Sequence, residues 1–155
     1  MTGRSIMEAA IGLALDAHEG QRDWNGCPFI LHPMRVGMAL AQQYDELHGA
    51  VGVLHDSVED SNGLITKEII AANCGTLVAE AVDLLTRREA EHYDDEYLVR
   101  VMTDRLATRV KLADLADNLG PFRLMVANDH QAKVLVRHGR ALHRVRDYAR
   151  TMKWI

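Results

Sequence analysis

This 155-residue chain has no basic excess, no long apolar run and few cysteines, and each absence excludes a class of protein. Asp and Glu outnumber Lys and Arg by 22 to 18, so the net charge is −4 and nothing in the composition favours a nucleic-acid partner. Apolar runs stay below the ~18 residues that a membrane-spanning helix needs, so we expect no membrane segment. With 48% hydrophobic and 26% charged residues, the composition is that of an ordinary globular protein.

Cys27 and Cys74 are the only cysteines, too few for a disulfide framework. The apolar stretch within residues 1–20 is interrupted by acidic residues and is followed by no cleavage-like site. We therefore expect a mature helix there rather than a signal peptide. Both observations favour a reducing, cytoplasmic setting in which the two thiols are free and buried or partly buried.

Apolar residues recur at three- and four-residue spacing along most of the chain, which is the pattern of amphipathic helices. Alternating strand patterns, internal repeats and low-complexity linkers are missing, and the charge-dense range 88–97 indicates an exposed turn and helix start. We therefore predict an all-α fold, a helical bundle of about eight helices that takes up residues 1–155 as one domain. The helical ranges are 5–19, 33–44, 46–60, 66–73, 76–87, 104–119 and 129–151.

The stretch "LHDSVED" (54–60) places four ionisable residues after a small, apolar helical run, where charge is costly unless it is paired or bound to a metal. At helical spacing, His55 and Asp56 form one layer, and Glu59 and Asp60 form a second layer one turn later. The first layer suits an ion such as Mn, Fe, Zn or Mg, and a carboxylate one turn away can hold or deprotonate its water. The position one turn beyond Asp56 holds another acid, which disfavours a solvated, salt-bridged face.

Two further candidate ligands lie elsewhere in the chain. His32 occupies the apolar setting "ILHPMRV", and Asp114 lies among apolar residues in "VKLADLADNL". A buried histidine bonded to backbone is the alternative for His32, and an ion pair is the alternative for Asp114.

Taken together, "AHEGQ…NGCPFILHPMRV", "LHDSVED" and "VKLADLADNL" resemble the HD-domain metal-dependent phosphohydrolases. The resemblance is closest to the hydrolase domain of the RelA/SpoT enzymes and to the small alarmone hydrolases, and it covers most of residues 14–120. It implies an all-α HD domain and a metal that is usually Mn²⁺, with other divalent metals possible. It also implies removal of the 3′-pyrophosphate of (p)ppGpp by a metal-bound hydroxide. Residues 121–155 hold only a closing helix, so we expect a stand-alone hydrolase.

The resemblance also implies roles for individual residues. Activation of the water falls to Glu59 and Asp60, and contact with the nucleotide sugar falls to Asn118. The implied metal ligands are His32, His55, Asp56 and Asp114.

The chain departs from the family's pattern at Asp23 and Trp24, where typical members carry an Arg-Lys pair that helps to hold base and phosphates. Arg22 lies one place earlier, and the ring of Trp24 could stack on a base. Lys111, one turn before Asp114, is a further candidate to contact phosphate. Other arginines that could contact phosphate are Arg35, Arg87, Arg88 and Arg123.

Three alternatives stay open at this point. The same metal site could serve a nucleotidase or a phosphatase acting on another nucleotide such as NADPH. The chain could also be a catalytically silent, nucleotide-binding regulatory module, or a helical bundle with scattered charge. The expected partner is a small-molecule nucleotide, and the sequence carries no signal for oligomeric state. We expect His18 to make a structural hydrogen bond, and His138 to be a bystander.

Overall fold

We describe a computed structural model of the chain, which places residues 3–123 and 128–155. Within these residues the regular secondary structure is helical and no strand is formed, which confirms the predicted all-α fold. Two of the α-helices, α4 and α7, are single turns. The elements are α1 (Ile6–Ala17), α2 (Leu31–Gln43), α3 (Glu46–Leu54), α4 (Ser57–Asp60), α5 (Lys67–Cys74), α6 (Thr76–Leu85), the π-helix η1 (Tyr93–Tyr97), α7 (Leu98–Val101), α8 (Arg105–Asn118) and α9 (Asp129–Thr151).

Side chains just before the helices satisfy the free backbone N–H groups of their first turns. Ser5 and Glu8 form a reciprocal capping box at α1. Four other helices begin after a residue whose side-chain oxygen accepts the backbone N–H three positions on. These residues are Asp45, Thr66, Asp104 and Asn128.

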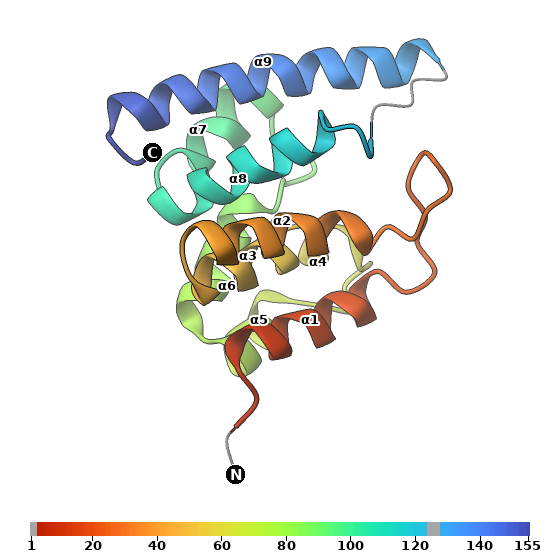
Figure 1. The fold of residues 1–155 in the computed structure, drawn as a ribbon, viewed down its shortest axis with the longest axis vertical. Coiled ribbons are helices and arrows are strands. Elements are labelled where there is room, and N and C mark those ends of the chain that lie inside the picture. The colour runs from red at the N-terminus through yellow and green to blue at the C-terminus, as the bar shows by residue number, and fades with distance from the viewer. Residues whose placement is uncertain (1–2, 124–127) are drawn as a thin grey trace.

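The helices form a layered bundle, with α9 lying along one end beside α8, α2 and α3 in the middle, and α1 and α5 toward the other end (Figure 1). None of the described helices is long and apolar enough to cross a membrane. Helix α9 turns Ala141, Val145 and Ala149 into the core, so its apolar face packs on the rest of the chain.

Helices α2 and α3 approach closely because glycines lie where they meet. A Cβ at Gly37 would come within 2.8 Å of the Gly49 carbonyl oxygen, and one at Gly52 within 2.7 Å of Leu40 Cδ1. Any larger residue would push the backbones apart. The close approach brings the rings of His32 and His55, one from each side, to a centroid distance of 5.1 Å.

The predicted continuous helix over residues 46–60 is wrong, because α3 ends at Leu54 and α4 begins at Ser57. In an unbroken helix the Gly52 carbonyl would accept a hydrogen bond from the backbone N–H of Asp56. Here that carbonyl accepts a hydrogen bond from His55 Nδ1 at 2.7 Å, and Asp56 has φ −101° and ψ −6°. The break therefore lies at the two residues whose side chains form the site.

Two smaller expectations are also corrected. The charge-dense range 88–97 is exposed only in part, because Tyr93 and Tyr97 are buried at the two ends of η1. Cys74 is buried as expected, but Cys27 is exposed, and both thiols are free. Tyr93 and Tyr97 are four residues apart and share one face of η1, but the three acidic residues between them masked this buried side in the sequence.

Candidate active site

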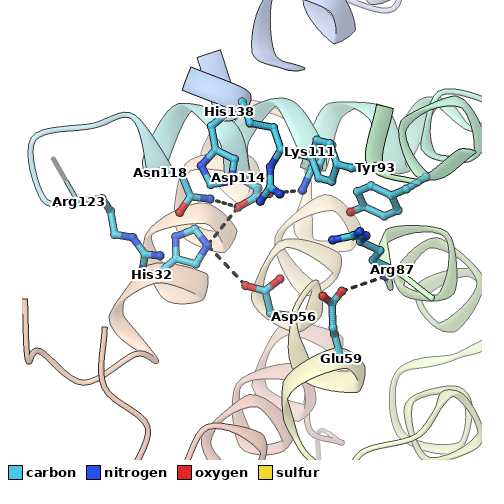
Figure 2. A pocket seen from close by; sticks show the side chains of 12 residues that line it. His32, Asp56, Glu59, Arg87, Tyr93, Lys111, Asp114, Asn118, Arg123 and His138 are labelled. Carbon is cyan, nitrogen blue, oxygen red and sulfur yellow. Dashed lines mark hydrogen bonds and ion pairs between the residues drawn. The ribbon is translucent and has the colours of Figure 1, made fainter. Parts of the chain in front are cut away.

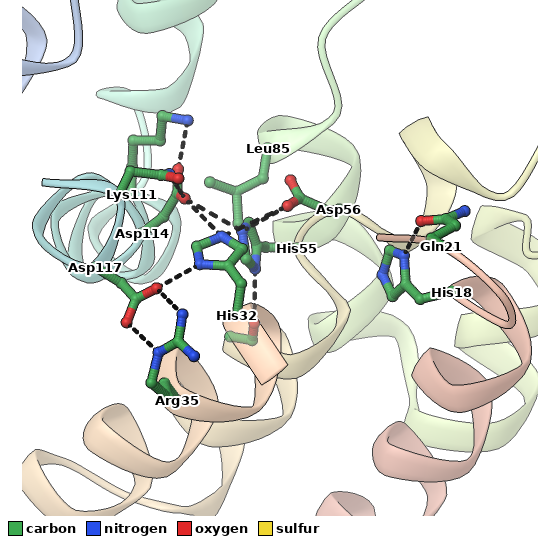
Figure 3. Close-up of polar contacts among 12 residues, drawn as sticks. His18, Gln21, His32, Arg35, His55, Asp56, Leu85, Lys111, Asp114 and Asp117 are labelled. Carbon is green, nitrogen blue, oxygen red and sulfur yellow. Dashed lines mark hydrogen bonds and ion pairs between the residues drawn. The ribbon is translucent and has the colours of Figure 1, made fainter. Parts of the chain in front are cut away.

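Side chains from three segments converge on one point in the middle of the bundle (Figure 3). His32 comes from the first turn of α2, His55 and Asp56 from the break between α3 and α4, and Asp114 from α8. Ligand atoms of the first three all lie within 4.8 Å of one another. Asp114 Oδ1 lies 3.2 Å from His32 Nε2 and 3.4 Å from His55 Nε2. The structure thus brings together all four predicted metal ligands.

Hydrogen bonds on the far side of each ring determine which imidazole nitrogen faces the cluster with a lone pair. His55 Nδ1 lies 2.7 Å from the Gly52 carbonyl, and His32 Nδ1 lies 2.7 Å from Asp117 Oδ2. Both partners can only accept, so each Nδ1 carries a proton and donates it. Each Nε2 of a neutral ring then presents a lone pair to the cluster, as metal-ligating histidines do. Nε2 of His55 is buried, and its polar neighbours are the carboxylates of Asp56 at 3.1 Å and Asp114 at 3.4 Å.

The separations within the cluster fit a single small ion. Two ligand atoms that bind one ion at about 2.1 Å lie roughly 3.0–3.4 Å apart at tetrahedral or octahedral angles. Three separations lie in this range: 3.1 Å from Asp56 Oδ2 to His55 Nε2, and 3.2 Å and 3.4 Å from Asp114 Oδ1 to the Nε2 atoms of His32 and His55. The separation of Asp56 Oδ2 from His32 Nε2 is longer, at 3.7 Å. Mixed imidazole and carboxylate donors suit a divalent ion of the Mn, Fe, Zn or Mg kind. The donor set therefore fits a divalent metal.

Asp114 is the most heavily engaged member of the cluster. Its Oδ2 accepts from Lys111 Nζ at 2.7 Å, and its Oδ1 accepts from Asn118 Nδ2 at 2.6 Å. Burial would raise the pKa of Asp114, but Lys111 and His55 outweigh burial and hold the pKa well below its usual range. Asp114 is therefore a carboxylate at neutral pH, with a second lone pair on each oxygen still available to an ion.

The other charges in the cluster follow the same balance. Burial opposes ionisation of Asp56, but the neighbouring His55 lowers its pKa to about 2. Burial likewise opposes protonation of His55, and the carboxylates of Asp56 and Asp114 raise its pKa well above the usual value. In each case the charged neighbours outweigh the burial. A divalent cation would take over the role that the proton on His55 plays here.

Glu59 and Asp60, the predicted catalytic pair, differ in position. Glu59 lines the cavity beside the cluster, and its Oε2 accepts the backbone N–H of Arg87 at 2.9 Å. Partial burial raises the pKa of Glu59. Partial burial and the nearby carboxylates of Asp56 and Glu59 raise the pKa of Asp60 to about 7. Asp60 is not among the residues that line the cavity, and its carbonyl accepts from Gln21 Nε2 at 2.8 Å.

The cavity beside the cluster has a volume of ≈ 210 Å³, and Figure 2 shows the side chains that line it. Two sets of its residues carry opposite charge. The acidic group consists of Asp56, Glu59 and Asp114, with His32 beside them. The cationic group consists of Arg87, Lys111, Arg123 and Arg137.

Several polar atoms that line the cavity are buried and lack a hydrogen-bond partner within the described part of the chain. They are the Tyr93 hydroxyl, Arg123 Nη1, Arg137 Nε and His138 Nδ1. The guanidinium of Arg137 lies 4.6 Å from the centre of the Tyr93 ring. Unpaired buried donors are costly, so this side of the cavity is suited to an anionic ligand that would accept from them.

The four predicted substrate-binding residues fall into two groups. Asn118 and Lys111 line the cavity, whereas Arg22 and Trp24 lie outside its lining. Arg22 and Trp24 belong to the loop between α1 and α2. There Arg22 pairs with Pro28 in an isolated bridge, and Trp24 is half exposed. Asp23 Oδ1 accepts the backbone N–H groups of Asn25 and Cys27, both at 2.9 Å, so its carboxylate shapes this loop.

Some residues of the site were missed or misjudged from the sequence. His138 was expected to be a bystander but lines the cavity, and burial lowers its pKa to about 4, so it is neutral. Asp117, which holds His32, and Arg137, which lines the cavity, were not singled out from the sequence. His18 makes the expected structural hydrogen bond, from Nδ1 to Gln21 Oε1 at 2.8 Å.

An all-α fold that gathers a histidine, a His-Asp pair and a distant aspartate at one point has the arrangement typical of HD-domain hydrolases. No family model matches the chain. Over 118 residues it is 36% identical to a guanosine-3′,5′-bis(diphosphate) 3′-pyrophosphohydrolase of Vibrio cholerae, a match that covers 69% of this chain and 16% of that protein. Over 120 residues it is 30% identical to the bifunctional (p)ppGpp synthase/hydrolase SpoT of Escherichia coli, with 69% and 16% covered.

A solved structure of a metazoan ortholog of SpoT that hydrolyses ppGpp superimposes with a TM-score of 0.69. The match covers 100% of this chain and 99% of the other at 20% identity, which shows that the two folds agree. By sequence and by fold, the chain resembles HD-domain proteins of the RelA/SpoT hydrolase type. It spans 16% of the length of each of the two curated relatives named above.

Proposed function

We propose that this chain is a divalent-metal-dependent phosphohydrolase that removes the 3′-pyrophosphate of (p)ppGpp, with Mn²⁺ as its metal. The observation that carries the proposal is the convergence of two imidazole Nε2 atoms and two carboxylates on one point, at the edge of a cavity lined by cations. The relatives named for the same activity support the substrate. We propose further that residues 1–155 act as one HD-type hydrolase domain in the cytoplasm, with a small-molecule nucleotide as partner.

The metal in this proposal is held by His32, His55, Asp56 and Asp114. When bound, such an ion supplies a Lewis acid and lowers the pKa of water toward neutrality. His55 and Asp56 directly follow α3, whose last residues Val53 and Leu54 are buried, and the Gly52 carbonyl fixes the orientation of the His55 ring. Lys111 and Asn118 keep the carboxylate of Asp114 in one orientation.

Glu59 accepts a proton from the attacking water in this scheme. Its carboxylate lines the cavity, and the Arg87 backbone N–H holds one of its oxygens. Partial desolvation and the nearby carboxylate of Asp56 raise its pKa, which makes it a better base than a free glutamate. Asp60 assists from outside the cavity lining, because a carboxyl with a pKa of about 7 can receive a proton at neutral pH.

The cationic group binds the phosphates of the substrate and stabilises the charge that develops on them. Arginine matches phosphate oxygens in a bidentate manner, and the unpaired donors of Arg123 and Arg137 are already buried at the cavity. Asn118 contacts the nucleotide sugar, and Arg22 and Trp24 contact the substrate at the rim of the site.

A second candidate is a phosphatase or nucleotidase acting on another nucleotide such as NADPH. It is favoured by the loop at Asp23 and Trp24, which provides no cation to the cavity and uses Asp23 to shape its own turn. A catalytically silent nucleotide-binding module is disfavoured, because Glu59 is in place beside the metal ligands.

A panel of nucleotides tests the proposal. Purified chain loaded with Mn²⁺ is incubated with ppGpp, GDP, GTP and NADPH, and phosphate and pyrophosphate are measured separately. The proposal expects pyrophosphate and GDP from ppGpp and no phosphate from the other three. Release of phosphate from NADPH with no pyrophosphate from ppGpp would establish the second candidate instead. Binding of ppGpp without any product would establish the silent module.

A further inference from the structure

The ring of His32 lies between two carboxylates of α8, and only one of them belongs to the metal cluster (Figure 3). Its Nε2 lies 3.2 Å from Asp114 Oδ1, and its Nδ1 lies 2.7 Å from Asp117 Oδ2. Asp114 and Asp117 are three residues apart on one helix and therefore share a face, one turn apart. The imidazole thus spans one turn of α8, with one nitrogen turned to each carboxylate.

Asp117 is held in turn by Arg35 of α2. Nε of Arg35 donates to Asp117 Oδ1 at 2.7 Å, and Nη2 donates to Oδ2 at 2.9 Å, which is a bidentate pair. The guanidinium also packs over the ring of Phe122, 5.1 Å from its centre. Because Arg35 follows His32 by three residues, one face of α2 meets one face of α8 through both pairs of side chains.

A carboxylate that accepts from the far nitrogen of a metal-ligating histidine changes the properties of the nitrogen that binds the metal. It fixes the tautomer, orients the ring and makes the ligating nitrogen more basic, and loss of such a partner costs ~10–100-fold in metal affinity. The two histidines of this cluster differ in this respect. His55 Nδ1 donates to a neutral backbone carbonyl, whereas His32 Nδ1 donates to a carboxylate.

We propose that Asp117 and Arg35 are positioning residues of the metal centre. Asp117 sets the tautomer, the orientation and the donor strength of His32, and Arg35 acts through Asp117 by holding both of its oxygens. The inference rests on the part of the proposed function that assigns a divalent ion to His32. It does not depend on which nucleotide the site cleaves.

The chain offers a matched control in a second carboxylate–histidine pair. His48 Nδ1 lies 2.7 Å from Asp45 Oδ1, the same contact at the same distance. Nε2 of His48, however, lies 3.2 Å from Arg109 Nη1 and is not part of the metal cluster. Substitution of Asp45 therefore removes the same kind of contact without touching a candidate ligand.

The test measures Mn²⁺ affinity by isothermal titration calorimetry on the full chain and on D117N, R35Q, the double variant and D45N. We expect D117N to bind Mn²⁺ ~10–100-fold more weakly than the wild type. We expect R35Q to weaken binding by a smaller factor and to add nothing in the D117N background. D45N should bind as the wild type does. Long-range ¹H–¹⁵N NMR of the metal-free chain should report a proton on His32 Nδ1 that D117N partly moves to Nε2.

Three outcomes would overturn the inference: wild-type affinity in D117N, equal weakening in D45N, or no metal binding by the wild type. Full additivity in the double variant would overturn the role of Arg35. If D117N does not fold, R35Q carries the test, since Arg35 is partly exposed. Pyrophosphate release is measured separately. A wild type that binds Mn²⁺ but cleaves no ppGpp would refute the proposed function and leave the inference on Asp117 standing.

Discussion

The acidic and cationic groups that line the cavity differ in how the chain assembles them. The acidic group is local in part, because Asp56 and Glu59 lie three residues apart, whereas Asp114 and the neighbouring His32 come from two other helices. The cationic group comes from separate segments, with Arg87 after α6, Lys111 on α8, Arg123 beyond α8 and Arg137 on α9. A local motif supplies half of the residues behind the chemistry of the site, whereas each cation of the surface proposed to bind the substrate comes from a different segment.

Substitution of a proposed metal ligand should have the largest effect, because it removes the chemistry. We expect Asp56→Asn to lose hydrolysis and to weaken Mn²⁺ binding by more than the ~10–100-fold that a supporting residue contributes. Calorimetry and pyrophosphate release measure the two effects. Retained Mn²⁺ affinity in Asp56→Asn would remove this residue from the ligand set.

Glu59→Gln should separate proton transfer from metal binding within the acidic group. We expect kcat to fall by ~10²–10⁴-fold, the usual contribution of a general base. Mn²⁺ affinity should stay near the wild-type value, because Glu59 is not among the proposed ligands. Glu68→Gln, at an exposed position on α5, is the matched control and should leave both quantities unchanged. A wild-type kcat in Glu59→Gln would refute its role.

Arg137→Gln should affect the cationic group alone. We expect kcat/KM for ppGpp to fall by roughly 10–100-fold, since hydrogen bonds to charged groups contribute about 1.5–3 kcal/mol. Mn²⁺ affinity should be unchanged. Arg140→Gln, on the same helix but outside the lining of this cavity, is the control. An equal loss in both variants would indicate damage to α9 rather than loss of a phosphate contact.

The smallest effect concerns stability in acid. Partial burial of Asp117 would raise the pKa of its carboxyl group. Hydrogen bonds from His32 and Arg35 outweigh this effect and lower the pKa from 3.8 to about 2. Its stabilising contribution is therefore present above pH 4 and is lost as the pH falls through 2. We expect the stability difference between metal-free wild type and Asp117→Asn to shrink by ~2 kcal/mol from pH 5 to pH 2. Urea unfolding measures it, and the exposed Asp16→Asn variant should show no such change.

The sequence was informative where function depends on near neighbours. The six helices outside the charged motif could be predicted because the apolar spacing within each helix, and a capping residue such as Thr66 just before one of them, are local signals. The four candidate ligands could be selected because charge among apolar residues is costly. The break at Asp56 could not be predicted, because apolar spacing and helix propensity do not reveal that the His55 ring binds the Gly52 carbonyl.

Long-range contacts explain the rest of what was missed. Asp117 and Arg35 look like ordinary surface charges until α2 and α8 pack together across 82 residues of sequence. Arg137 lies on an amphipathic helix that is otherwise rich in exposed basic residues, and nothing local distinguishes it from Arg140. Tyr93 is surrounded by acidic residues in the sequence, yet it is buried against Arg137.

The most direct test of the account locates the metal. A crystal of the full chain grown with Mn²⁺ and measured near the manganese absorption edge gives an anomalous-difference map. We expect one strong peak within bonding distance of His32 Nε2, His55 Nε2 and the carboxylates of Asp56 and Asp114. A peak elsewhere in the molecule, or none in protein that calorimetry shows to bind Mn²⁺ at one site, would contradict the account.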